Sequence, residues 1–196
     1  MYPVTIAGPR VILREFEPDD LDPSMAVVGD DAVTRTLSFD SRTRDEQAAR
    51  LADDIARARS EPRSDYYLAI VAREGDAPEA PAEAGTPAGG PLIGFVRLGL
   101  LAHRAGELGY ALRRDRWGQG YAHEAARLML DFTFTTVGLH RVQAACGPDN
   151  ERSRALLERI GFRCEGRIRD HVFTNGAWRD SLLYSLLEHE WRGWKA

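Results

Sequence analysis

Cysteine is scarce in this chain of 196 residues, which contains only Cys146 and Cys164. Two thiols cannot build the multiple-disulfide framework of a small secreted protein, and neither lies in a C-x-x-C motif. They could pair in principle, but in a chain of this size they are more typical of small buried hydrophobic residues in a reducing compartment. We therefore expect a cytoplasmic protein.

The chain also lacks a surplus of positive charge and any long apolar segment. It has 26 Lys and Arg residues against 30 Asp and Glu, a formal net charge of −4, which disfavours binding to a nucleic-acid backbone. No apolar run approaches the length of a membrane span, and residues 1–16 do not have the pattern of a signal peptide. The five histidines and two cysteines lack the spacing of metal ligands, so no metal is expected.

Regular secondary-structure patterns cover most of the remaining chain. A content of 43% hydrophobic and 29% charged residues is typical of a soluble globular protein, and the length suits one domain, 1–196, with its own core. Apolar alternation predicts strands over residues 10–16, 66–73, 91–101, 106–114, 140–146, 163–173 and 177–187. Asn175-Gly176, between the last two, is a strong hairpin signal.

Helices are predicted where apolar residues recur at helical spacing behind a start signal. One begins near Pro18, a second has a capping box of Thr43 and Glu46, a third runs over 121–137, and a fourth over 150–160. The resulting order indicates a mixed α/β domain with an antiparallel first half and a strand–helix–strand unit in the middle. Residues 74–91 are rich in Pro, Ala and Gly, which predicts a long flexible loop between two neighbouring strands.

Two glycines, Gly118 and Gly120, stand directly before the third predicted helix in the stretch "DRWGQGYAHEAARLML". A helix N-terminus offers unpaired N–H groups and partial positive charge, and glycines before it let a phosphate approach the backbone. The stretch matches neither the dinucleotide fingerprint, because the third glycine is replaced by His123, nor the P-loop, because no Lys-Ser or Lys-Thr follows. By itself it therefore indicates either an anion site or a tight turn.

Several stretches together resemble the GCN5-related N-acetyltransferase (GNAT) superfamily, and within it the RimJ/RimL-like branch that acetylates the N-termini of ribosomal proteins. They are "RVILREFEPDD", "ELGYALRRDRWGQGYAHEA", "NERSRALLERIGF", "EGRIRD" and "NGAWRDSLLYSLLEHEW". The resemblance spans nearly the whole chain apart from residues 74–91 and a variable region at 21–65. It implies a GNAT-type domain with a central, mostly antiparallel, twisted sheet of six to seven strands, about four flanking helices, and a parallel splayed strand pair at the cofactor site.

The resemblance also implies acetyl-CoA as cosubstrate, without a metal. The pyrophosphate would lie on the loop after the strand at 106–114, and the pantetheine arm along that strand and the start of the next helix. The residues carried over to cofactor binding are Tyr110, Ala111, Leu112, Trp117, Gly118, Gln119, Gly120, Tyr121, Ala122, Asn150 and Ser153. Asn150 is at the same time a good helix N-cap, and the strand residues serve the sheet as well.

Acetyl transfer to an amine needs a base for the amine and tolerance of the leaving thiolate. Many members of the superfamily have a tyrosine as proton donor where this chain has Leu157, so Ser153 is the remaining candidate, although a serine can also be satisfied by its own helix. Strand alternation puts Glu107 on the face of the small residues Gly109 and Ala111, which makes Glu107 the candidate for the base. A solvated carboxylate at a sheet edge is the alternative.

Three further groups compete for the role of base, Glu165, Asp170 and His171. No paired serine or cysteine nucleophile is visible, so direct attack by the amine in a ternary complex is the simpler mechanism.

The acceptor is open between a protein or peptide N-terminus, which the branch resemblance favours, and a small amine such as a polyamine, amino acid or antibiotic. Asp30, Asp31 and Asp40 in the variable region would suit a cation and suit a solvated loop equally well. A third alternative is a domain that binds acetyl-CoA as a sensor without turnover. The final strands resemble ones through which relatives pair, so a homodimer is compatible with the sequence.

Overall fold

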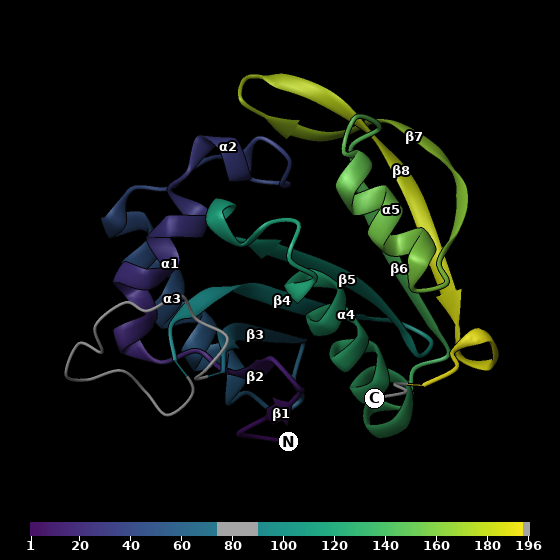
Figure 1. Ribbon diagram of the computed structural model, residues 1–196, viewed down its shortest axis with the longest axis horizontal. Coiled ribbons are helices and arrows are strands. Elements are labelled where there is room, and N and C mark those ends of the chain that lie inside the picture. The colour runs from purple at the N-terminus through teal and green to yellow at the C-terminus, as the bar shows by residue number, and fades with distance from the viewer. Residues whose placement is uncertain (74–89, 194–196) are drawn as a thin grey trace.

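A single twisted sheet forms the framework of the protein and carries helices on both faces (Figure 1). The computed structural model describes residues 1–73 and 90–193, and within them the sheet has eight strands in the order β1-β2-β3-β4-β5-β6-β8-β7. The strands are β1 (Thr5–Ala7), β2 (Val11–Glu15), β3 (Asp65–Ala72), β4 (Leu92–Leu101), β5 (Ala105–Leu112), β6 (Arg141–Cys146), β7 (Arg163–Thr174) and β8 (Ala177–Leu187). The α-helices are α1 (Leu21–Val28), α2 (Asp31–Thr34), α3 (Arg44–Ala58), α4 (Tyr121–Phe132) and α5 (Glu151–Arg159).

The mixed α/β architecture, the mostly antiparallel sheet and the strand–helix–strand unit are confirmed. The capping box is formed as predicted: the Thr43 N–H donates to Glu46 Oε2 at 2.8 Å, and the Glu46 N–H donates to Thr43 Oγ1 at 3.3 Å. Asn175 and Gly176 separate β7 from β8. Two short elements, β1 and α2, escape sequence prediction because three or four residues are too few to display a period.

Alternate residues of the central strands feed two hydrophobic clusters on opposite faces of the sheet. In β3, Leu68 and Ile70 join the cluster beneath α4 and α5, whereas Ala69 and Val71 join the cluster beneath α1 and α3. The strands in the middle of the sheet are therefore buried on both faces. This burial on both sides explains their nearly continuous apolar sequences.

The parallel pair of β5 and β6 is short, because Ala105, Gly106 and Glu107 of β5 pair with Arg141, Val142 and Gln143 of β6. From Leu108 onward, the edge of β5 that faces β6 pairs with no strand of the described residues. The α4 helix follows β5 and the α5 helix follows β6. The two strands thus diverge, and a helix begins beyond the end of each.

The two cysteines differ in their surroundings. Both are free thiols, Cys146 buried at the end of β6 and Cys164 exposed on β7. The prediction of two buried thiols is therefore wrong for Cys164, because β7 is the edge strand of the sheet and most of its side chains face solvent.

The predicted loop and the expected absence of a membrane span can be compared with the structure only over the described residues. Of the predicted loop 74–91, residues 74–89 lie outside them. Over residues 1–73 and 90–193, no helix is long and apolar enough to cross a membrane.

Candidate active site

The loop that leads into α4, residues 117–122, contains two glycines with left-handed backbone conformations. Gly118 and Gly120 have φ values of 74° and 85°, in the left-handed region that residues with a side chain rarely adopt. Gly120 is the N-cap of α4, and no side chain caps that end of the helix. A Cβ on Gly118 would meet nothing within 4 Å. The start of α4 is therefore a helix N-terminus without a side-chain cap, the kind of helix end that binds anions.

The same loop is held in place by its own neighbours. The Trp117 indole N–H donates to the Leu112 carbonyl at 2.8 Å, and the Gln119 amide donates to the Asp115 carbonyl at 2.8 Å. The Trp117 ring packs against both hydrophobic clusters. These hydrogen bonds to the end of β5 and to the turn after it therefore fix the conformation of the loop.

A distant residue, Arg10, also braces this loop. Its guanidinium donates to the Gln119 carbonyl at 3.0 Å and to Glu124 Oε2 at 3.2 Å, and it lies 4.7 Å from the centre of the Tyr121 ring. The buried Glu124 carboxylate in turn accepts the backbone N–H groups of Arg10 and Val11 at 2.7 and 3.0 Å. The beginning of β2 therefore fixes the first turn of α4, a role that no local sequence pattern indicates.

The start of α5 lies next to the same loop. Asn150 caps the helix as predicted, because its Oδ1 accepts the Ser153 N–H at 3.1 Å. Arg152 lies in the first turn of α5, and its guanidinium is 4.9 Å from the centre of the Trp117 ring. The Arg152–Trp117 contact joins the N-terminal ends of α4 and α5 on either side of the divergence between β5 and β6.

Within the divergence, Tyr110 reaches from β5 to α5. Its Oη lies 2.9 Å from Ser153 Oγ, and burial raises the pKa of Tyr110 above its usual range. Leu157, one turn beyond Ser153, is buried in the core with 1% of its surface exposed. Ala111 and Leu112 are buried at the end of β5, where they pair with Phe95 and Gly94 of β4.

Glu107 is exposed on an interior strand, at the last residue of β5 that pairs with β6. Its Oε2 accepts the Gln143 side-chain amide at 3.0 Å. Gly109, two residues further along β5, is exposed as well, and a Cβ there would meet nothing within 4 Å. The carboxylate therefore stands beside open space where the strands separate, and not at an edge of the sheet.

The three competing groups all lie on β7. Arg141 and Ser185 donate hydrogen bonds to Glu165, which lowers the pKa of Glu165 to about 2 and makes it a weak base. His171 Nδ1 lies 3.0 Å from Ser181 Oγ, and the Asp170 N–H donates to Asp180 at 2.9 Å. Since β7 is three strand positions from β5, the backbone of these residues is about 14 Å from that of β5. Of the three side chains, that of Glu165 reaches back across β8, to Arg141 of β6.

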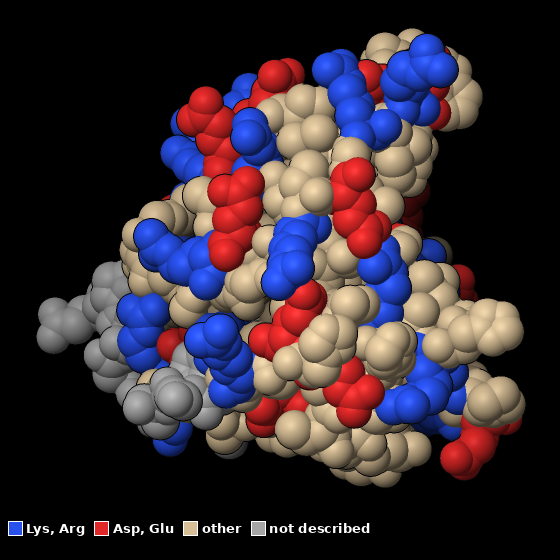
Figure 2. All heavy atoms as spheres, turned by 90° about the vertical axis from the view of Figure 1, so that its right-hand side faces the viewer, with Lys and Arg blue, Asp and Glu red and all other residues tan. Residues whose placement is uncertain are grey.

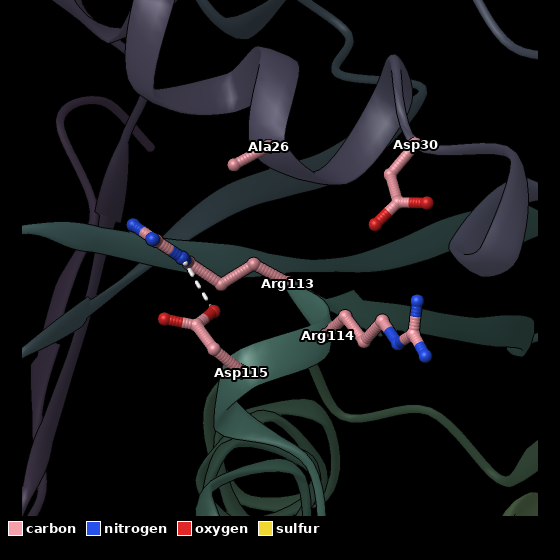
Figure 3. A pocket seen from close by; sticks show the side chains of 5 residues that line it. All are labelled: Ala26, Asp30, Arg113, Arg114 and Asp115. Carbon is pink, nitrogen blue, oxygen red and sulfur yellow. Dashed lines mark hydrogen bonds and ion pairs between the residues drawn. The ribbon is translucent and has the colours of Figure 1, made fainter.

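A hollow of about 520 Å³ lies between the end of β5 and the α1–α2 region (Figure 3). It is lined by Ala26, Asp30, Arg113, Arg114 and Asp115. Arg113 is paired with Asp115 at 2.7 Å, while the Arg114 side chain extends on the side of Asp30. The hollow therefore offers charges of both signs.

The acids predicted for the variable region have different fates. Asp31 accepts the Ser41 hydroxyl, and Asp40 accepts the Asn175 N–H at 2.8 Å. Arg179 donates to the carbonyls of Arg35 and Leu37. Asp30 caps α2, because its Oδ1 accepts the Ala32 N–H at 2.8 Å, and its side chain also lines the hollow. All three acids therefore make internal contacts, and that of Asp40 ties the tip of the β7–β8 hairpin to the segment after α2.

Charges are mixed over the surface that Figure 2 displays. Basic and acidic side chains alternate across this face without a large region of one sign. Among the described residues, no group of three or more His, Cys, Asp or Glu is placed to hold a metal ion.

Comparison with known proteins gives the family. Residues 10–163 match the model of the acetyltransferase (GNAT) domain. The uncharacterized N-acetyltransferase p20 of Bacillus licheniformis is 29% identical over 191 residues, 96% of this chain and 99% of that protein. The ribosomal protein uS5-alanine N-acetyltransferase of Escherichia coli is 36% identical over 84 residues, 43% of each chain.

Among solved structures, Mycobacterium smegmatis RimJ in complex with CoA-disulfide superposes with a TM-score of 0.77 at 26% identity, covering 97% of this chain and 91% of that one. The family match, the diverging parallel strands and the uncapped glycine loop agree with one another. This chain belongs to the GNAT family of acetyltransferases and is related to its RimJ-like N-acetyltransferases.

Proposed function

We propose that the protein transfers the acetyl group of acetyl-CoA to the N-terminal α-amino group of a peptide or protein. The observation that carries the proposal is the divergence of β5 from β6 between two helix N-termini, one of which has no side-chain cap. A phosphate group is stabilised by such an end through hydrogen bonds and the helix dipole. GNAT acetyltransferases use acetyl-CoA, and the RimJ neighbour was solved with a CoA derivative.

In this proposal, the glycine loop, residues 117–122, binds the pyrophosphate mainly through backbone N–H groups, while the Trp117 N–H donates to the Arg114 carbonyl at 3.2 Å. The free edge of β5 at Tyr110, Ala111 and Leu112, together with Asn150, binds the pantetheine arm. A backbone N–H on this edge also steadies the oxyanion that forms at the thioester carbonyl. A phosphate fits beside Gly118 because this residue has no Cβ, and no atom of the described residues beyond its chain neighbours lies within 4 Å of the position that a Cβ would take.

Glu107 and Ser153 carry the chemistry. Glu107 takes a proton from the acceptor ammonium group, and the neutral nitrogen bonds to the acetyl carbon. The carbon–sulfur bond breaks with its electron pair going to sulfur, and the nitrogen gives its remaining surplus proton to solvent. Ser153 donates a hydrogen bond to the departing thiolate. The amine attacks directly, in a ternary complex, because within the described part of the chain no cysteine or serine of the divergence has a paired base.

The peptide is favoured over a polyamine by the carboxylates on the acceptor side. A polyamine carries several positive charges and would need several unpaired carboxylates, whereas Asp31 and Asp40 are engaged within the protein and Glu165 is paired with Arg141. A peptide N-terminus presents one amine, for which Glu107 suffices. The relative that acts on ribosomal protein uS5 also supports this choice.

Replacing Arg152 by alanine should weaken the binding of acetyl-CoA through its phosphates. Arg152 joins the two helix ends beside the glycine loop, and a hydrogen bond to a charged group contributes about 1.5–3 kcal/mol, at least tenfold in affinity. We expect Arg152→Ala to raise the KM for acetyl-CoA about tenfold and to leave the KM for S-acetylpantetheine, which has no phosphates, unchanged.

The matched control for that variant is Arg159→Ala. Arg159 is exposed on the same helix, about 10 Å further along it, so its loss removes the same charge away from the loop. Equal increases in KM for both donors in Arg152→Ala would contradict a role in phosphate binding.

Replacing Gly109 by valine should hinder binding of the acceptor peptide while increasing the stability of the protein. Valine suits a strand better than glycine, so the free energy of unfolding should rise by about 0.5–1 kcal/mol. The new side chain would stand beside Glu107 in the open space above β5. We expect the KM for the peptide to rise at least tenfold with the KM for acetyl-CoA unchanged; a wild-type KM for the peptide would place the acceptor elsewhere.

The proposed acceptor class is tested by thiol release from acetyl-CoA against a panel of amines. The panel holds short peptides with varied N-termini, spermidine, free amino acids and an aminoglycoside. The proposal expects the highest kcat/KM for a peptide, with the acetyl group found on its α-amine by mass spectrometry. A higher kcat/KM for spermidine or the aminoglycoside would overturn the peptide assignment and leave the acetyltransferase.

A further inference from the structure

Among the hydrogen bonds of the described residues, one joins β5 directly to α5 across the divergence, and it is made by the Tyr110 side chain. Its Oη lies 2.9 Å from Ser153 Oγ, and the two residues are 43 positions apart in the chain. The Tyr110 ring packs against the cluster beneath α4 and α5. The hydroxyl is therefore held at the start of α5 by the packing of its ring.

Ser153 is fixed from a second side. Its backbone N–H donates to Asn150 Oδ1 at 3.1 Å, which sets the first turn of α5 and leaves the serine hydroxyl to interact with groups in the divergence. A hydroxyl has one proton to donate and two lone pairs that accept. If Tyr110 donates to Ser153 Oγ, the serine proton is left to point at another acceptor, and the Cys146 thiol, which also hydrogen-bonds with Ser153, competes for it.

The protonation of Tyr110 favours this direction of the hydrogen bond. Burial raises the pKa of Tyr110 above its usual range, so the phenol stays protonated at neutral pH. A neutral phenol is also the stronger donor of the two hydroxyls, since its ordinary pKa of about 10 is far below that of an aliphatic alcohol.

We propose that Tyr110 is a positioning residue for acetyl transfer: its hydroxyl donates to Ser153 Oγ and thereby directs the Ser153 O–H to the departing sulfur. This inference rests on the proposed function, in which Ser153 meets the thiolate. Tyr110 keeps its proton. The electron pair of the broken carbon–sulfur bond goes to sulfur, the amine proton goes to Glu107, and solvent carries that proton away.

The variant that tests this role is Tyr110→Phe, which removes the hydroxyl and keeps the ring. Because the serine hydrogen bond matters only as charge develops on sulfur, we expect kcat to fall about tenfold and the KM for acetyl-CoA to change less than twofold. Ser153→Ala should lower kcat at least as much. The double variant should be no slower than Ser153→Ala, because Tyr110 acts through the serine.

The chain offers a matched control in Tyr184→Phe. Tyr184 is buried with 1% of its surface exposed and donates to Glu158 on the same helix at 3.0 Å. Its loss tests whether any tyrosine hydroxyl bonded to α5 is needed for kcat. We expect Tyr184→Phe to retain the wild-type kcat, with thermal unfolding recorded for all four variants.

The outcomes separate this inference from the proposed function. A wild-type kcat in Tyr110→Phe, or losses that multiply in the double variant, would overturn the positioning role while the acetyltransferase stands. A kcat that falls equally in Tyr184→Phe would also overturn it, as a general effect on α5. A wild-type protein that releases no thiol with any amine would overturn the proposed function and this inference together.

Discussion

Replacing Glu107 by glutamine should lower kcat at least 100-fold, because a general base contributes about 10²–10⁴ to the rate of a proton-transfer step. Glutamine keeps the size of the side chain and its contact with Gln143 but cannot take a proton from the amine. Glu107 is the last residue of β5 to pair with β6, so the lost carboxylate lies where the strands separate. The KM for acetyl-CoA should be unchanged in initial-rate measurements.

The control for this variant is Glu165→Gln. The pKa of Glu165 is lowered to about 2 by Arg141 and Ser185, so this carboxylate is a weak base and its loss should reduce kcat less than threefold. A Glu107→Gln enzyme that retains the wild-type kcat, or a larger loss in Glu165→Gln, would remove Glu107 from the mechanism.

Replacing Gly118 by alanine should raise the KM for acetyl-CoA at least tenfold. Alanine at a φ of 74° is strained by about 1–2 kcal/mol, and the added methyl group lies where the phosphate is proposed to approach the backbone. Titration of CoA by calorimetry measures the loss directly, and the peptide KM should not change.

The matched control is Gly138→Ala. Gly138 has nearly the same φ, 73°, and a Cβ there would also meet nothing within 4 Å, but it follows the helical segment that contains α4 and the π-helical turn Thr133–Val137. Both variants should therefore lose similar stability, while only Gly118→Ala loses CoA affinity. Equal CoA affinities in the two variants would show that the glycine loop does not bind the phosphates.

The fold was predictable where the pattern is local. The capping box at Thr43, the N-cap at Asn150 and the turn at Asn175-Gly176 all depend on residues within four positions of each other, and all three are formed. The strands show alternation or apolar runs because the sheet is buried on one or both faces. The resemblance supplied the parallel pair and its divergence, which no single segment encodes.

Contacts between distant segments were not predictable from the sequence. Arg10 and Glu124 are 114 residues apart, and they meet only because the beginning of β2 packs against α4. Tyr110 entered the prediction only as a residue of the cofactor-binding strand, because a strand pattern does not say that its hydroxyl reaches Ser153. The exposure of Cys164 was missed because being on an edge strand is a property of the whole sheet.

The account is tested most directly by initial rates of thiol release with acetyl-CoA and a peptide both varied. It predicts that release requires the peptide, that double-reciprocal lines intersect as for a ternary complex, and that the acetyl group appears on the peptide α-amine. CoA binding without thiol release for any amine would instead indicate a sensor domain, and parallel lines with an acetylated protein would contradict direct attack.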